Sequence, residues 1–224
     1  MAALKVIPPL SITDSNLTSS TVPETDYSAW SSGTTYTIGQ RVILTSTHKI
    51  YESLQNSNLN KNPATDTSSP PYWIEVSPTN RWKMFDTNNS TQTAQANSIV
   101  VVITPGRVIN SVALLGVEGT SVRIKQTDPT DGVVYDTTFN LNNNGNINNW
   151  YNYFFDPISR KTSVIATDLK AYGSAAIEIT ITYTGFTAKC GVCVLGSTQL
   201  IGEGINLGAS VGIQDYSRKE KDTF

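Results

Sequence analysis

An isoleucine or a tyrosine takes every second position from Ile177 to Tyr183, and polar or charged residues fill the positions between them. A period of two puts the apolar side chains on one face of a strand, because successive side chains of a strand point to opposite sides. Runs rich in β-branched residues recur along the second half of the chain and are separated by turn signals such as Pro105-Gly106. The pattern predicts an all-β fold whose main part is a jelly-roll-type β-sandwich of about eight strands. We expect these strands at residues 99–103, 108–117, 121–126, 133–139, 150–155, 164–166, 176–183 and 190–195.

The composition favours the same fold and argues against several classes of partner. Charged residues make up 15% of the 224-residue chain, compared with about 25% in an average globular protein, and Ser, Thr and Asn take their place. The net charge is −2, and the one dense charged run, Arg218 to Asp222, mixes both signs, so we expect no nucleic-acid partner. No stretch approaches the roughly 20 apolar residues of a membrane span, and the first ten residues do not resemble an export signal. We therefore expect no membrane span, and synthesis and folding in a cytoplasm.

Changes in composition divide the chain into four segments. Residues 1–25 mix Ser, Thr and Pro with scattered apolar residues, which predicts an extended N-terminal arm or, alternatively, a disordered tail. Residues 26–78 are rich in aromatic residues and turn signals and predict a small module of three strands. Residues 79–197 hold the predicted sandwich. Residues 198–224 combine several glycines with scattered apolar residues, which predicts a C-terminal docking segment.

Five aromatic residues of the small module are candidate carbohydrate contacts. A sheet of three short strands has little core of its own, so some of these rings are needed for burial. Flat rings at a surface also suit sugars, because the apolar face of a pyranose stacks on them. Both interpretations stay open for each ring. The five residues are Trp30, Tyr36, Tyr51, Tyr72 and Trp73.

Residues that carry chemistry in enzymes are sparse in this chain. The single histidine, His48, falls in a predicted surface turn, and nothing near it in the sequence supports a Ser-His-Asp arrangement. Cys190 and Cys193 form a C-x-x-C pattern within a predicted strand, which indicates buried core thiols rather than a redox or zinc site. We therefore predict that the chain is not an enzyme and has no catalytic residue.

Acidic residues give no firm sign of a metal or of glycosidase chemistry. The segment from Asp128 to Gly132 looks like half of a calcium-binding loop, but the further carboxylates and terminal Glu of an EF-hand are absent. A plain turn between strands is the prediction there. Glycosidase chemistry needs a facing pair of carboxylates, and none is marked out by its context. We expect no cofactor; a structural calcium ion bound through scattered backbone oxygens stays open.

The small module has a recognisable order and spacing of residues, which runs Ala29-Trp30, Tyr36, Gly39, Val42, Tyr51, Asn62-Pro63 and Trp73. In this pattern, residues 29–76 resemble the chitin-binding type 3 family, the carbohydrate-binding modules of families 5 and 12. Members usually carry an aromatic residue soon after the tyrosine strand, where this chain has Glu52-Ser53-Leu54. The resemblance implies a small β module that binds carbohydrate through its aromatic residues.

Four further segments carry a second resemblance: residues 4–10, 80–86, 111–116 and 208–220. Through them the whole chain resembles a group of phage and prophage proteins that join such a module to a β-sandwich. The resemblance implies a structural component of a virion tail, at the tail tip, the baseplate or the base of a fibre, that touches host surface glycan. Its partners would be other tail or baseplate proteins and copies of itself in a trimer or hexamer. A stand-alone lectin-like protein and, last, a polysaccharide-degrading enzyme are the alternatives.

Overall fold

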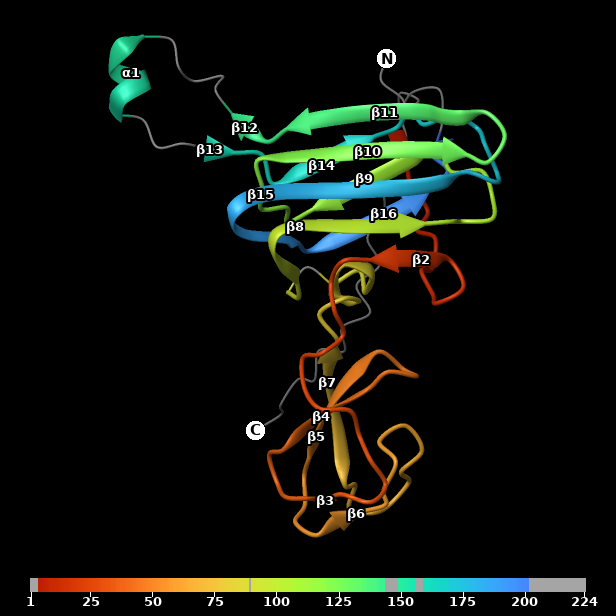
Figure 1. The fold of residues 1–224 in the computed structure, drawn as a ribbon, viewed down its shortest axis with the longest axis vertical. Helices are drawn as coiled ribbons and strands as arrows, with labels where there is room; N and C mark the ends of the chain where they lie inside the picture. Colours follow the sequence, from red (N-terminus) through yellow and green to blue (C-terminus); the bar gives the residue numbers. More distant parts are fainter. Residues whose placement is uncertain (1–3, 89, 144–148, 156–158, 202–224) are drawn as a thin grey trace, which may run out of the picture.

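The structure is a computed structural model of the chain and describes residues 4–88, 90–143, 149–155 and 159–201. A larger β-sandwich and a small β module follow each other along the long axis of the molecule (Figure 1). The strands pair antiparallel in every sheet of the described residues. The prediction of an all-β chain is confirmed.

The larger lobe contains two sheets. The first has five strands in the order β11-β10-β15-β8-β2, and the second has three strands in the order β14-β9-β16 and lies behind the first in Figure 1. The strands of the first sheet are β2 (Leu17–Ser20), β8 (Thr93–Ile103), β10 (Ser121–Asp128), β11 (Gly132–Asn140) and β15 (Ala176–Cys190). Those of the second are β9 (Ser111–Leu115), β14 (Ser163–Ala166) and β16 (Val192–Gly196).

Alternating side chains of the central strands form the sandwich core. The isoleucines of β15 from Ile177 to Ile181 are almost fully buried, and Ile99, Val101 and Ile103 of the neighbouring strand β8 are completely buried beside them. Side chains of the second sheet belong to the same cluster. Burying one such side chain stabilises a fold by about 1.5–3 kcal/mol, so these two strands supply much of the driving force. The alternation in the sequence predicted this face correctly.

The small module has a three-stranded sheet in the order β4-β5-β7 and a short ribbon of β3 and β6. Its strands are β3 (Thr35–Tyr36), β4 (Arg41–Leu44), β5 (Lys49–Ser53), β6 (Asn58–Leu59) and β7 (Trp73–Pro78). A single turn of 3-10 helix, η1 (Lys83–Phe85), follows where the chain leaves the module for the sandwich. The three-stranded sheet expected in this segment is present.

The N-terminal segment runs along the sandwich of its own chain. Strand β2 pairs with β8, and Leu10 and Ile12 pack against the sandwich core. A Cβ atom on Gly196 would lie 2.2 Å from the carbonyl oxygen of Pro8, so only glycine permits the segment to cross β16 this closely. Further out, β1 (Leu4–Val6) pairs with β17 (Gln199–Ile201). Residues 202–224 of the predicted docking segment lie outside the described residues.

The prediction of a strand at residues 150–155 is wrong. These residues form the helix α1 (Trp150–Phe155), which projects from the sandwich beyond a short ribbon of β12 (Asn142–Asn143) and β13 (Ser159–Arg160) (Figure 1). Aromatic residues favour strands on average, but this run lacks the alternation of apolar and polar residues that marks a half-buried strand. Among the described helices, none has the length and apolar character that crossing a bilayer requires.

The turn between β10 and β11 is closed by the carboxylate of Asp128. Its Oδ1 atom accepts the backbone N–H groups of Thr130 at 2.9 Å and Asp131 at 3.2 Å, and its Oδ2 atom accepts the Ser174 hydroxyl at 2.5 Å. The Ser174 hydroxyl, followed by the Thr130 N–H, holds the pKa of Asp128 below its ordinary value of 3.8. Gly132 completes the turn with a φ of 75°.

Replacing Ser174 should weaken the fold more at neutral pH than in acid. A lowered folded-state pKa adds stability that is present above the unfolded pKa and is lost as the pH falls through the folded pKa. We expect Ser174→Ala to unfold at a lower denaturant concentration at pH 7, with the difference shrinking below about pH 4. Urea midpoints between pH 7 and pH 2.5 measure this, with Ser32→Ala on an exposed turn as the control. A difference that grows on acidification would contradict it.

Candidate functional site

Three of the five predicted carbohydrate contacts form the core of the small module. Tyr36, Tyr51 and Trp73 are at most 7% exposed and cluster with Val42. The rings of Tyr36 and Trp73 meet edge to face with centroids 5.2 Å apart. The Trp73 Nε1–H group donates to the carbonyl oxygen of Lys61 at 2.8 Å, so its polar atom is also satisfied inside the module. These three rings hold the module together and have little surface left for a ligand.

The other two predicted contacts, Trp30 and Tyr72, are half-buried and pack against the same cluster. The Lys61 ammonium lies 5.1 Å from the centroid of the Tyr72 ring, within the range of a cation–π contact. The Tyr72 backbone N–H donates to Asp66 at 3.0 Å. Burial opposes the charged form of Asp66, but hydrogen bonds from Ser68 and Tyr72 outweigh it and lower the pKa. The Tyr72 ring is thus partly exposed and lies beside the Lys61 ammonium, and its backbone is fixed by the hydrogen bond to Asp66.

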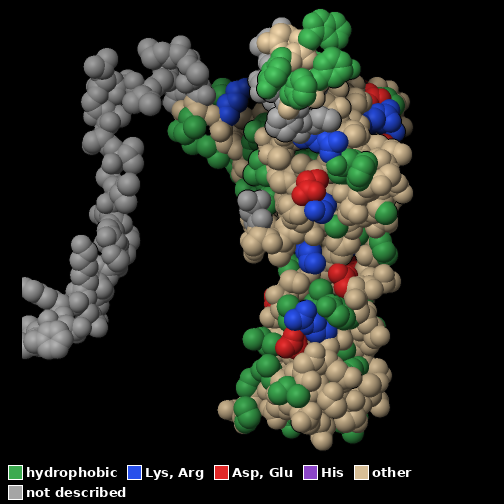
Figure 2. Space-filling view, turned by 90° about the vertical axis from the view of Figure 1, so that its left-hand side faces the viewer, with side chains coloured by type: hydrophobic (Ala, Val, Ile, Leu, Met, Phe, Trp, Pro, Cys, Tyr) green, Lys and Arg blue, Asp and Glu red, His purple; other side chains and the backbone are tan. Residues whose placement is uncertain are grey.

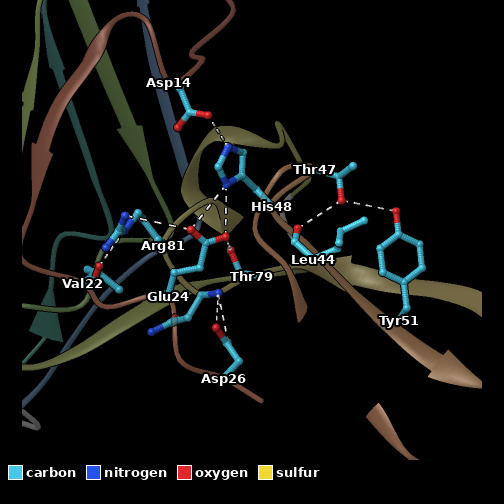
Figure 3. Close-up of polar contacts among 11 residues, drawn as sticks. Asp14, Val22, Glu24, Asp26, Leu44, Thr47, His48, Tyr51, Thr79 and Arg81 are labelled. Carbon is cyan, nitrogen blue, oxygen red and sulfur yellow. Dashed lines mark hydrogen bonds and ion pairs between the residues drawn. The ribbon is translucent and has the colours of Figure 1, made fainter. Parts of the chain in front are cut away.

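The structure gives His48 two carboxylate partners that lie far from it in the sequence (Figure 3). His48 lies in the turn between β4 and β5, with Nδ1 3.1 Å from Glu24 Oε1 and Nε2 2.9 Å from Asp14 Oδ2. Its ring stacks on Trp82 with centroids 4.1 Å apart, and its side chain is only 20% exposed. The expectation of a surface histidine therefore missed a half-buried cluster.

Glu24 connects three parts of the chain in this cluster. Its side chain is 9% exposed and accepts the Thr79 hydroxyl at 2.8 Å, in addition to its contact with His48. The Arg81 guanidinium lies 3.9 Å from the other carboxylate oxygen and donates through Nε to the carbonyl oxygen of Val22 at 2.8 Å. Glu24 precedes the small module, His48 lies within it, and Thr79 and Arg81 follow it. The carboxylate therefore fixes the junction between the two lobes.

An open cavity of about 300 Å³ lies at this junction. Its volume is at the lower end of the range for small-molecule pockets, about 300–1,000 Å³, and junctions between domains are frequent places for them. The cavity combines rings with charged groups, an arrangement that suits a small polar ligand. No local pattern predicts the cavity, because its lining residues come from three separate segments of the chain. The rings are those of His48, Trp82 and Phe85, and the charges are those of Asp14, Lys49 and Asp86.

The largest exposed aromatic surface lies on helix α1. Its five aromatic side chains, from Trp150 to Phe155, are 61–77% exposed and contact one another, as in the Trp150–Phe154 stack with centroids 6.1 Å apart. Figure 2 shows hydrophobic side chains gathered at the end of the molecule where α1 projects. Soluble proteins rarely expose contiguous apolar patches without a contact function. A second exposed ring, Phe186, lies on β15 and is 63% exposed.

The other candidates for chemistry have structural roles. Cys190 and Cys193 are free and buried, as expected, and burial raises the pKa of Cys190 to about 12 and that of Cys193 well above its ordinary value. The chain turns at Gly191, so the two thiols belong to different strands and not to one strand as predicted. In the described part of the chain, no three His, Cys, Asp or Glu side chains come together as a metal site.

Comparisons with known proteins give no family. No protein-family model and no curated protein matches the sequence. Solved structures that align with it include a variant of chitosan-binding module 1 of a chitosanase/glucanase from Paenibacillus sp. IK-5, with 13% identity and a TM-score of 0.34 over 52% of this chain and 83% of the module. The unmodified module aligns with 14% identity and a TM-score of 0.33, over 50% of this chain and 81% of the module. A variant of the lectin binding domain of lectinolysin complexed with Lewis b aligns with 8% identity and a TM-score of 0.36, over 52% of this chain and 82% of that domain. At these values, the alignments assign no function to this chain.

Removing the His48 side chain should destabilise the protein, because the nearly buried Glu24 carboxylate loses a partner. In His48→Ala the Glu24 carboxylate stays largely buried with one partner fewer, and the stack on Trp82 is lost. We expect a loss of about 1–3 kcal/mol in the free energy of unfolding, measured by guanidinium denaturation. Asp14→Asn is the control, because the Asp14 side chain is 77% exposed and should change stability by less than about 0.5 kcal/mol. Equal effects of the two substitutions would contradict the role given to Glu24.

Proposed function

We propose that this chain is a structural, non-enzymatic component of a bacteriophage tail that binds carbohydrate on the host surface. The tail assignment is supported by the resemblance of segments such as residues 4–10 and 80–86 to phage and prophage proteins. The observation that carries the contact function is the exposed aromatic surface of α1. The runner-up is a lectin-like protein that acts alone, with the same glycan contacts and no assembly.

Two exposed apolar surfaces support assembly with neighbouring proteins. Helix α1 has no charged side chain, so contact with another protein would bury its rings without desolvating a charge. The ribbon of β1 and β17 pairs with no other strand among the described residues, and Leu4, Leu200 and Ile201 are exposed on it. The outer edges of a two-stranded apolar ribbon carry free backbone N–H and C=O groups, with which a strand of another chain can pair. A trimer or hexamer, or docking on a tail or baseplate protein, would cover both surfaces.

The glycan contact proposed for the small module involves Trp30 and Tyr72. They are the two predicted contacts that keep exposed surface, and Tyr72 has the Lys61 ammonium beside it. An aromatic ring offers a stacking surface for the apolar face of a sugar ring, and an ammonium group donates hydrogen bonds to hydroxyls. One such site binds weakly, and an oligomer that presents several sites to one surface would add avidity.

Titration with host surface polysaccharide and chitin oligomers tests the glycan proposal, with tryptophan fluorescence as the readout. We expect saturable binding that Tyr72→Ala weakens at least about tenfold, with a smaller loss of stability than a fully buried ring would give, because Tyr72 only packs against the edge of the core cluster. Trp73→Ala is the contrasting core variant and should lose about 3–5 kcal/mol of stability. Undiminished binding by both Tyr72→Ala and Trp30→Ala would remove the glycan site from the small module. No binding of any glycan would leave assembly as the function.

Light scattering at several protein concentrations tests the assembly proposal. We expect the mass of a trimer or hexamer for the wild-type chain, and a lower mass for Trp150→Ser/Phe154→Ser at the same concentration. The melting temperature of the isolated monomer should not fall, because both rings are exposed. Phe186→Ser is the matched control, an exposed ring outside α1. A wild-type chain that stays monomeric at every concentration and binds no tail or baseplate protein would contradict the proposal.

A further inference from the structure

Phe186 is held at the surface by an irregularity in the central strand pair. Tyr183 of β15 pairs with Asn97 of β8, but Thr187 pairs with Ala96, so three residues of β15 bulge out between them. Gly185 adopts a φ of 80°, and its N–H group donates to Asn97 Oδ1 at 2.9 Å. Bulges redirect side chains, and this one leaves the Phe186 ring 63% exposed, together with Thr184, Gly185 and Thr187 beside it.

Tyr183 links this exposed ring to a cation. The Phe186 and Tyr183 rings stack with centroids 4.8 Å apart at an angle of 29°. The Arg160 guanidinium carbon lies 4.7 Å from the Tyr183 centroid, and Arg160 Nη1 donates to the Tyr183 hydroxyl. Tyr183 is half-buried and packs against the sandwich core, so it anchors both neighbours. The exposed ring and the guanidinium therefore both contact the same half-buried tyrosine.

The backbone of Arg160 is fixed as well. Arg160 ends β13 and pairs with Asn142 of β12, and the next residue, Lys161, donates its N–H group to the carbonyl oxygen of Leu141 at 2.8 Å. Leu141 is completely buried in the sandwich core. Among the ion pairs of the described residues, none engages Arg160. Its guanidinium has five N–H donors, and the Tyr183 hydroxyl occupies one of its nitrogen atoms.

We propose that Phe186 and Arg160 form a binding site for an acidic saccharide, a pyranose that carries a carboxylate. The Phe186 ring takes the apolar face of the sugar, and the planar guanidinium matches a carboxylate with two parallel hydrogen bonds. The exposed Lys161 next to it in the sequence adds positive charge to the same end of the sandwich. This site rests on the proposed carbohydrate binding and gives it a second contact, on the sandwich, with a stated charge preference.

A plainer role for Arg160 is to clamp the β12–β13 ribbon onto Tyr183, and the two roles predict different results. Calorimetric titration with tetragalacturonic acid, its methyl ester and neutral chitin tetramer separates them, because the first two differ in charge at constant size. We expect the acid to bind about tenfold more tightly than the ester at low salt, with the preference shrinking as salt is added. A clamp alone would give no preference.

Three variants connect the preference to these side chains. Arg160→Gln should reduce the affinity for the acid to that for the ester, and Arg160→Lys, which keeps the charge but loses the planar fork, should give an intermediate affinity. Phe186→Ala should weaken both ligands equally, and Phe154→Ala on α1 should change neither. If Arg160→Gln lowers the melting temperature, the preference of Arg160→Lys for the acid over the ester, compared with that of the wild type, decides whether the guanidinium binds the carboxylate.

The outcomes separate this site from the proposed function. Equal binding of acid and ester, or a preference that survives in Arg160→Gln, overturns the acidic-sugar site. Chitin binding that Tyr72→Ala abolishes, together with no response to the acid, overturns this site and leaves the glycan contact of the small module intact. No response to any of the three ligands overturns the acidic-sugar site and the chitin contact of the small module together.

Discussion

The pairing of β8 with β15 is the interaction on which the larger lobe depends. The two strands lie side by side in the five-stranded sheet, and their inward side chains are almost fully buried in the core. The irregularity in their register is what brings Phe186 to the surface. Beyond Cys190, the chain turns at Gly191 and continues as β16 in the opposite sheet, so the same strand also connects the two layers.

The junction between the lobes depends on a different kind of interaction. A nearly buried carboxylate is stable only with partners, and Glu24 has a histidine within the small module and a hydroxyl and a guanidinium on the segment that follows it. The stack of His48 on Trp82 adds an apolar contact at the same place. Polar and apolar contacts therefore act together at the junction.

Local pattern predicted the sandwich strands well and the sites poorly, for physical reasons. Strands with one buried face leave a period of two in the sequence, and the face from Ile177 to Ile181 followed it. Helix α1 broke the expectation because five aromatic residues in six positions have no period to read. Aromatic content alone could not tell the buried Trp73 from the half-exposed Tyr72 beside it. The Glu24–His48 contact and the Arg160–Tyr183 pair join residues 23 or more positions apart, and a single sequence carries no signal for such contacts.

Strand β2 comes before the small module and pairs with β8, which comes after it. The small module is therefore inserted between two neighbouring strands of one sheet, and two stretches of backbone connect it to the sandwich. During synthesis β2 leaves the ribosome first and has no partner until the whole small module and then β8 have followed. The module can close on its own cluster in that interval, because its strands pair only with one another. The small lobe can therefore fold before the sandwich, and β2 cannot join the five-stranded sheet until β8 has been made.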